Sequence, residues 1–171
     1  MPQRSPTILA LDPGLRDLGF AALSGAHLLD SGVLTLRTVP PLQRLRTVRA
    51  RLEQWIEQHA PDVLVIENVP RRPLDSLPGL PALGRLLRRT AGRYDLELVM
   101  YSAKTARRTV AGDGWAGKAE VAKAIAAHFP QLRVYRGQDR KWKERYWQNM
   151  FDAIALALHH QNVTQQPSRS R

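Results

Sequence analysis

Two short apolar runs, each followed at once by a carboxylate, constrain the fold of this chain more than any other feature. Residues 7–11 form the first run, which ends at Asp12, and residues 63–66 form the second, which ends at Glu67. Runs of this length that are rich in branched side chains are typical of strands buried on both faces of a sheet. If the two strands are neighbours, both carboxylates project into the same small volume.

Turn residues and a change of hydrophobic period divide the rest of the chain into short elements. Residues 19–23 and 32–36 are expected to be strands, with turn signals at Ser24-Gly25 and Asp30-Ser31, and they extend the first strand into an antiparallel meander. The further elements expected are an amphipathic helix at 41–59, a strand at 62–66, a loop at 69–81, a helix at 83–94, a strand at 97–101, a basic helix at 102–110, a loop at 111–117, a helix at 118–129 and a last helix from about 146 to 160.

This order of elements predicts a single α/β domain with a mixed sheet and helices on its faces. The domain is expected to span residues 1–162, because no linker or internal repeat divides them. Residues 163–171 are polar and basic, and we expect them to form a disordered tail.

The net charge of the chain is strongly positive. Lys and Arg number 26 against 15 Asp and Glu, which gives a formal net charge of +11. An excess this large on one domain is the expected footprint of a protein that binds a polyanion, because its cations displace counterions from phosphates. A codon bias toward arginine is the alternative, and it explains the preference for Arg over Lys better than it explains the net charge.

The absence of some features excludes whole classes of protein. The chain has no cysteine, which excludes disulfides and thiolate metal sites. It has no apolar run of the length that a membrane helix needs, and residues 1–7 lack the apolar region of a secretion signal. We therefore expect a soluble, cytoplasmic protein with no membrane partner.

The two strand-ending carboxylates indicate a metal site. Two carboxylates that lie close together repel each other and raise one pKa unless a cation sits between them. Hard divalent ions such as Mg²⁺ and Mn²⁺ prefer oxygen ligands, so a pair formed by Asp12 and Glu67 would suit them. The alternative is that each acid only caps its strand or the helix that follows.

Asp152 is a third candidate ligand. It opens an otherwise apolar helical stretch at residues 152–158, where a buried charge needs a partner or a metal. A charge favourable to the dipole of a helix N-terminus is the alternative. Helical residues are expected to precede Asp152, which favours the metal ligand.

Basic residues follow the second acid and gather again in the third quarter of the chain. The candidates for DNA binding are Arg71, Arg72, Lys104, Arg107, Arg108 and Lys118, together with Trp115. Lys118 is also a catalytic candidate, because its charge can counter the charge that develops on a phosphate. Any one of these cations can be an ordinary solvated residue, so the cluster is more informative than its members. Trp115, in a glycine-flanked loop, is either a partial core anchor or a platform on which an exposed base stacks.

The histidines give no sign of a zinc site. The chain has five, and their spacing does not match that of zinc ligands. His159 and His160 are expected to end the last helix, where a positive charge is favourable.

Four motifs, in order along the chain, resemble those of the RuvC-type Holliday junction resolvases of the ribonuclease H-like superfamily. They are Ile-Leu-Ala-Leu-Asp-Pro-Gly at 8–14 with Gly19-Phe20, Val-Ile-Glu-Asn-Val at 65–69, a basic motif from Tyr101 through Arg107 to Val121, and Asp-Ala-Ile-Ala-Leu-Ala at 152–157. Each motif is moderately specific, and together they cover residues 8–160.

The resemblance implies a ribonuclease H-like fold, with a five-stranded mixed sheet flanked by helices. It implies an endonuclease of DNA recombination and repair, a homodimer that nicks two strands of a four-way (Holliday) junction, and it leaves a branch-migration motor as a further candidate partner. It implies that Asp12, Glu67 and Asp152 bind two Mg²⁺ or Mn²⁺ ions. Arg107 falls where the family usually has a basic residue, and Lys118 matches its functional lysine.

Two positions depart from the pattern of the family. The family normally has another metal-coordinating or catalytic residue, usually acidic, one helical turn before the last Asp, and Asn149 stands there. An amide oxygen can coordinate a hard ion but brings no charge, and the residues considered as compensating ligands are Gln148, Glu144 and Asp139. Pro70 stands where the family tends to place an aromatic residue that stacks at the centre of the junction.

Two other functions remain open at this stage. One is a nuclease of the same fold that acts on flaps, replication forks or RNA–DNA hybrids, which Asn149 and Pro70 favour slightly. The other is an inactive module that binds branched DNA without cutting it. The acids at positions 12, 67 and 152 argue against the inactive module, because buried acids without a metal are costly.

Overall fold

The computed structural model describes residues 5–68, 79–136 and 141–165, with the side chains of 141–145 excepted. Within these residues the chain forms five strands, five α-helices and a short 3-10 helix. Their bounds are β1 Thr7–Asp12, β2 Asp17–Ser24, β3 His27–Thr35, α1 Pro41–His59, β4 Val63–Glu67, α2 Leu80–Arg93, β5 Glu97–Tyr101, α3 Ala103–Ala111, α4 Lys118–His128, η1 Pro130–Tyr135 and α5 Lys141–Gln165.

The strands form one mixed sheet in the order β3-β2-β1-β4-β5. The first three strands are an antiparallel meander, as the turn signals predict. β4 and β5 are parallel to β1, and helical crossovers connect them, as parallel pairing requires. The α/β class and the mixed five-stranded sheet expected from the sequence are therefore confirmed.

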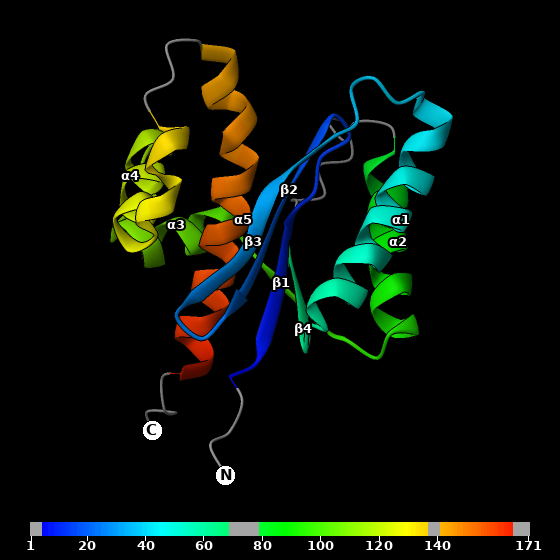
Figure 1. Cartoon of the computed structure of the whole chain (residues 1–171), viewed down its shortest axis with the longest axis horizontal. Helices are drawn as coiled ribbons and strands as arrows, with labels where there is room; N and C mark the ends of the chain where they lie inside the picture. Colours follow the sequence, from blue (N-terminus) through cyan, green and yellow to red (C-terminus); the bar gives the residue numbers. More distant parts are fainter. Residues whose placement is uncertain (1–4, 69–78, 137–140, 166–171) are drawn as a thin grey trace.

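Helices cover both faces of the sheet (Figure 1): α1 and α2 lie on one side, and α3, α4 and α5 lie on the other. The side chains of β1 alternate between the two cores. Leu9 and Leu11 pack with α1 and α2, whereas Ile8 and Ala10 pack against α5 and its neighbours. This strict alternation explains why the strand is apolar throughout, since both of its faces are buried.

The contact between α5 and β2 is unusually close at Gly19. A Cβ atom at this position would overlap the main chain of Asn149 and crowd the nitrogen of Met150. Glycine is therefore required here by the close approach of two backbones and not by its own backbone angles. The helix that carries Asp152 thus rests directly on the main chain of β2.

The structure corrects three local expectations. α2 begins at Leu80, inside the loop expected at 69–81, and ends at Arg93. Asp30-Ser31 is not a turn but part of β3, which begins at His27 after a tight turn at Gly25 and pairs with β2 up to Asp17. Pairing along the whole of β2 outweighs the local turn preference of these two residues. α5 is also longer than expected: it begins at Lys141 and ends at Gln165, so helix continues into the first residues of the expected tail.

Within the described residues, no helix is both long enough and apolar enough to span a membrane. Leu83 and Leu87 of α2 are fully buried in the core of the chain itself.

Candidate active site

Asp12 and Glu67 lie side by side at one edge of the sheet. β1 and β4 are parallel neighbours, with Leu11 paired to Ile66, so each acid occupies the next position on its strand. Alternation along a strand then gives the direction of their side chains. Each acid lies two residues after a side chain of the α5 core, Ala10 or Val65, so both carboxylates face α5.

The two carboxyl groups share a hydrogen bond, and the pKa of Asp12 is raised to about 9. Burial is the largest cause, and the negative charges of Glu67 and Asp152 come next. The positive charge of Lys118 acts in the opposite direction. At neutral pH without a cation, the Asp12–Glu67 pair therefore holds one proton.

Asp152 faces the pair from α5. It lies inside the helix, as expected, and burial raises its pKa, with a smaller contribution from the charge of Glu67. The side-chain nitrogen Nε2 of Gln148, one turn earlier, donates a hydrogen bond of 3.0 Å to Oδ1 of Asp152. This bond and the charge of Arg107 both lower the pKa of Asp152, so the carboxylate has partners that stabilise its charged form.

The donor set fits a hard divalent cation. Two partly buried carboxyl groups in contact can be neutralised by a proton or by a cation, and a third carboxylate faces them. Among the described side chains, no three Asp, Glu, His or Cys residues are close enough together to hold a metal ion as they stand. Mg²⁺ is usually bound by one or two carboxylates, with waters and substrate phosphates completing its shell, and the contacting pair meets that requirement.

Asn149 makes a contact that the sequence does not indicate. Its Nδ2 donates to the main-chain oxygen of Asp17 at the start of β2, at 3.3 Å. The amide therefore ties α5 to the sheet, and coordination of a metal by Asn149 stays a prediction. Asp17 itself is buried and is paired with Arg37.

Two of the predicted basic residues lie beside the acids. Lys118, the first residue of α4, is close enough to lower the pKa of both Asp12 and Asp152. Arg107 of α3 faces Asp152, and its Nε is buried with no hydrogen-bond partner among the described residues. Both cations are thus placed where a phosphate between them and the acids would be neutralised.

The other predicted DNA-binding residues are exposed or lie outside the described structure. Lys104 lies over the ring of Trp115, with Nζ 4.1 Å from its centre, and Trp115 is 80% exposed. The structure thus excludes Trp115 as a core anchor. Arg108 is exposed on α3. Four residues singled out in the sequence lie outside the described residues: Pro70, Arg71, Arg72 and Asp139. The side chain of Glu144 also lies outside them.

The comparison with known families is decisive. Residues 8–160 match the model of a family described as "Crossover junction endodeoxyribonuclease RuvC". The chain belongs to the RuvC family. It is 32% identical over 160 residues to the RuvC of a Nocardioides species, a match that covers 90% of this chain and 85% of that protein. It is 30% identical over 167 residues to the RuvC of Acidiphilium cryptum, which covers 94% of this chain and 92% of that protein.

Solved structures show the same fold. The structure of Thermus thermophilus RuvC in complex with a Holliday junction substrate matches with a TM-score of 0.70 at 21% identity, over 94% of this chain and 95% of that one. The yeast mitochondrial Holliday junction resolvase matches with a TM-score of 0.65 at 15% identity, over 91% and 77% of the two chains. The expected ribonuclease H-like fold is therefore confirmed, and membership in the RuvC family implies dependence on a divalent metal.

The RuvC fold of this chain also buries a polar network that the sequence does not predict. His159 and His160 are buried within α5 and do not end it, which corrects the expectation of two exposed cations at a helix terminus. Nδ1 of His159 is 2.6 Å from the hydroxyl of Thr109, and Nδ1 of His160 is 3.0 Å from the hydroxyl of Tyr101. Burial lowers the pKa of both histidines. The network joins α5 to β5 and α3 beside the acids, because Tyr101 pairs with Glu67 in the sheet.

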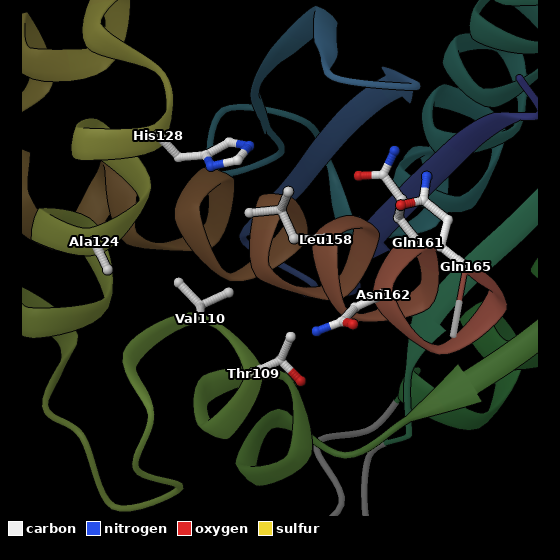
Figure 2. A pocket seen from close by; sticks show the side chains of 8 residues that line it. All are labelled: Thr109, Val110, Ala124, His128, Leu158, Gln161, Asn162 and Gln165. Atoms are coloured by element: carbon white, nitrogen blue, oxygen red, sulfur yellow. The ribbon is translucent and has the colours of Figure 1, made fainter. Parts of the chain in front are cut away.

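A hollow beyond this network lies between α3, α4 and α5 (Figure 2). Its lining includes Thr109, Val110, His128, Leu158 and Gln161, and it contains none of the predicted site residues. Leu158 is six residues beyond Asp152, which is about 9 Å along the helix. The hollow therefore belongs to the packing of the three helices and not to the carboxylate site.

Proposed function

We propose that this chain cuts four-way DNA junctions at the site formed by Asp12, Glu67 and Asp152, with two Mg²⁺ or Mn²⁺ ions bound there. As a member of the RuvC family it is a Holliday junction-resolving endonuclease of DNA recombination and repair. The observation that most supports this site is the contact between Asp12 and Glu67, because the raised pKa of Asp12 marks a place that suits a cation.

Divalent cations supply, when bound, an activated water and the charge that stabilises the leaving 3′ oxygen. The residues of the chain prepare the site for them. The Asp12–Glu67 pair gives up its shared proton on binding a cation, so occupancy of the site rises with pH. The hydrogen bond from Gln148 and the charge of Arg107 favour the charged form of Asp152 and oppose the burial that raises its pKa. Lys118 and Arg107, which lie beside the carboxylates, bind the phosphate and counter the charge that develops on it.

A synthetic four-way junction tests the proposal. The purified protein with Mg²⁺ or Mn²⁺ should leave nicks with 5′-phosphate and 3′-hydroxyl ends. Asp12→Asn and Glu67→Gln should each lower the rate by at least about a thousandfold, or about 4 kcal/mol of barrier. Junction binding should change little, because it comes mainly from the basic surface. Glu57→Gln, an exposed acid on α1, is the matched control and should cut normally.

The same assay separates the other functions. Flaps, forks and RNA–DNA hybrids, tested beside the junction at one salt concentration, should be cut more slowly than the junction. A protein that binds the junction tightly but leaves it intact with either metal would falsify the proposal and favour an inactive branched-DNA-binding module.

We also propose that the chain acts as a homodimer, because two strands of a junction must be nicked and each chain carries one site. Sedimentation of the full chain without DNA should give twice the mass of the monomer, and sedimentation with junction DNA should give two chains for each junction. The same proposal includes a branch-migration motor as a partner of the chain. It also includes binding of the junction through Arg71 and Arg72. Arg71→Ala with Arg72→Ala should weaken junction binding and reduce its dependence on salt.

A further inference from the structure

The loop between α3 and α4 holds Trp115 in an exposed position. The flanking residues are fixed: Gly112 takes a positive φ of 77°, and Ala116 is buried in the core next to α5. The main-chain nitrogen of Trp115 donates to Oδ1 of Asp113 at 2.9 Å. With its neighbour inserted in the core, the indole must point outward, and 80% of it is exposed.

A cation lies against this indole. Nζ of Lys104 on α3 is 4.1 Å from the centre of the ring, and Gly114 lies so close to Lys104 that a Cβ there would come within 2.9 Å of its Cγ. The lysine stem and the loop therefore lie against each other, and the ammonium group stays beside the ring. No other aromatic ring of the described residues is stacked on Trp115 in the structure.

The position of this loop relative to the acids is set by the chain. Lys118, which faces Asp12 and Asp152, is three residues after Trp115. Three extended residues span at most about 11 Å, which is about three base steps of DNA. If the DNA strand runs along this loop, a nucleotide about three steps from a phosphate at the carboxylate site meets Trp115.

We infer that Trp115 and Lys104 form a subsite for one unpaired nucleotide of the junction, with its base stacked on the indole and its phosphate held by the lysine. This inference rests on the proposed function. The ring is accessible, a cation lies beside it, and the two helices that flank the loop carry the exposed cations Arg108 and Lys118. An accessible ring beside cations is typical of a stacking platform for single-stranded DNA. A protein partner would be expected to need a wider apolar surface than one indole among cations.

Binding measurements on the full-length protein in Ca²⁺ test the subsite without cutting. The probes are a four-way junction and an intact duplex of the same length, with 2-aminopurine in the junction at each nucleotide near the crossover. Trp115→Ala should weaken binding to the junction by about 5- to 150-fold, which corresponds to the loss of one stacked base. It should leave duplex binding unchanged, because paired bases cannot reach the ring. Trp115→Phe should restore most of the loss.

Two further variants complete the test. Lys104→Met keeps the stem of the side chain and should weaken junction binding less than Trp115→Ala does. Leu42→Ala removes another almost fully exposed apolar residue, on α1, and should bind both DNAs normally. In the wild type, 2-aminopurine at one position should be quenched on binding, and this quenching should disappear in Trp115→Ala.

An equal loss on junction and duplex would overturn the subsite, and so would no loss on either. A Trp115→Ala protein that binds both DNAs normally but no longer dimerises would overturn it in favour of a contact between protein chains. Each of these results leaves the proposed function intact if the wild type still cuts the junction. Failure of the wild type to prefer the junction over the duplex would instead count against the proposed function.

Discussion

The two faces of the sheet differ in the polarity of the side chains that they bury. On the face covered by α1 and α2, the helices bury mainly apolar side chains, and the polar exceptions described there are Thr90 and the side chain of His59. On the face covered by α3, α4 and α5, the buried residues include Gln148, His159 and His160, and the acids lie at its edge. The first face stabilises the domain, and the second accepts costly polar burial in order to hold a reactive site.

The largest loss of stability should come from a substitution in the apolar core between the sheet and α1 and α2. Leu52 of α1 is fully buried, so Leu52→Ala should lower the free energy of unfolding by about 2–5 kcal/mol. Denaturant unfolding measures this loss. Under conditions where the variant is folded, its rate of junction cutting should equal that of the wild type. A large loss of rate in the folded variant would show that the two faces are not independent.

A smaller effect is expected from the polar face at Gln148. Gln148→Met keeps the shape of the side chain but removes the hydrogen bond that orients Asp152. Partners of this kind typically change metal affinity by about 10- to 100-fold, so Mn²⁺ should bind more weakly in a calorimetric titration. Unchanged Mn²⁺ affinity would assign the bond a purely structural role. Gln54→Met, an exposed residue on α1, is the control.

The Asp12–Glu67 pair should cost stability in the absence of metal. Because the pKa of Asp12 is raised in the folded state, the folded state binds more protons than the unfolded state at pH 5–8. Stability of the metal-free protein should therefore fall as pH rises from about 4 toward 9. Asp12→Asn should remove this slope and stabilise the metal-free protein at pH 8 by at least about 1.4 kcal/mol, the equivalent of one pKa unit. Thermal unfolding in a chelator measures the gain, and a destabilised variant would contradict it.

The smallest effect should come from the buried histidines. Burial lowers the pKa of His160, with Glu97 acting in the opposite direction, and His159 and Tyr101 are the other titratable groups in contact. The neutral form is thus favoured in the folded state, so its contribution to stability is present above about pH 6.5 and is lost as pH falls below it. His160→Gln can keep the hydrogen bond to Tyr101. The loss of unfolding free energy between pH 7 and pH 5 should be smaller in this variant than in the wild type, by about 1 kcal/mol or less. His27→Gln, at an exposed site, should leave the slope unchanged.

The same contrast explains what the sequence could predict. Asp12 and Glu67 follow strands whose apolar pattern is local, so their position at the sheet edge is readable from the chain alone. Alternation along the strand even gives the face to which they point. The turn expected at Asp30-Ser31 is instead part of β3, because these residues pair with β2. Pairing with a neighbouring strand cannot be predicted from the local sequence pattern.

The polar network could not be predicted for a related reason. His159 and His160 are buried only because α3 and β5 lie against α5, and their partners Thr109 and Tyr101 are about 50 and 59 residues away in the chain. Gln148 is different, since it precedes Asp152 by four residues. Its contact follows the ordinary spacing of side chains on one face of a helix and could have been expected.

The close approach at Gly19 has a consequence for anyone who redesigns this enzyme. Gly19 has no side chain, and this lets the main chain of α5 lie directly on β2. Gly19 therefore sets the distance between α5 and the sheet, and with it the position of Asp152. Even alanine at position 19 would push α5 away from the sheet. The distance from Asp152 to Asp12 and Glu67 would then increase although none of the three acids is substituted. An engineer who wants a wider or narrower metal site therefore has an adjustment point in β2, far along the chain from the residues that do the chemistry.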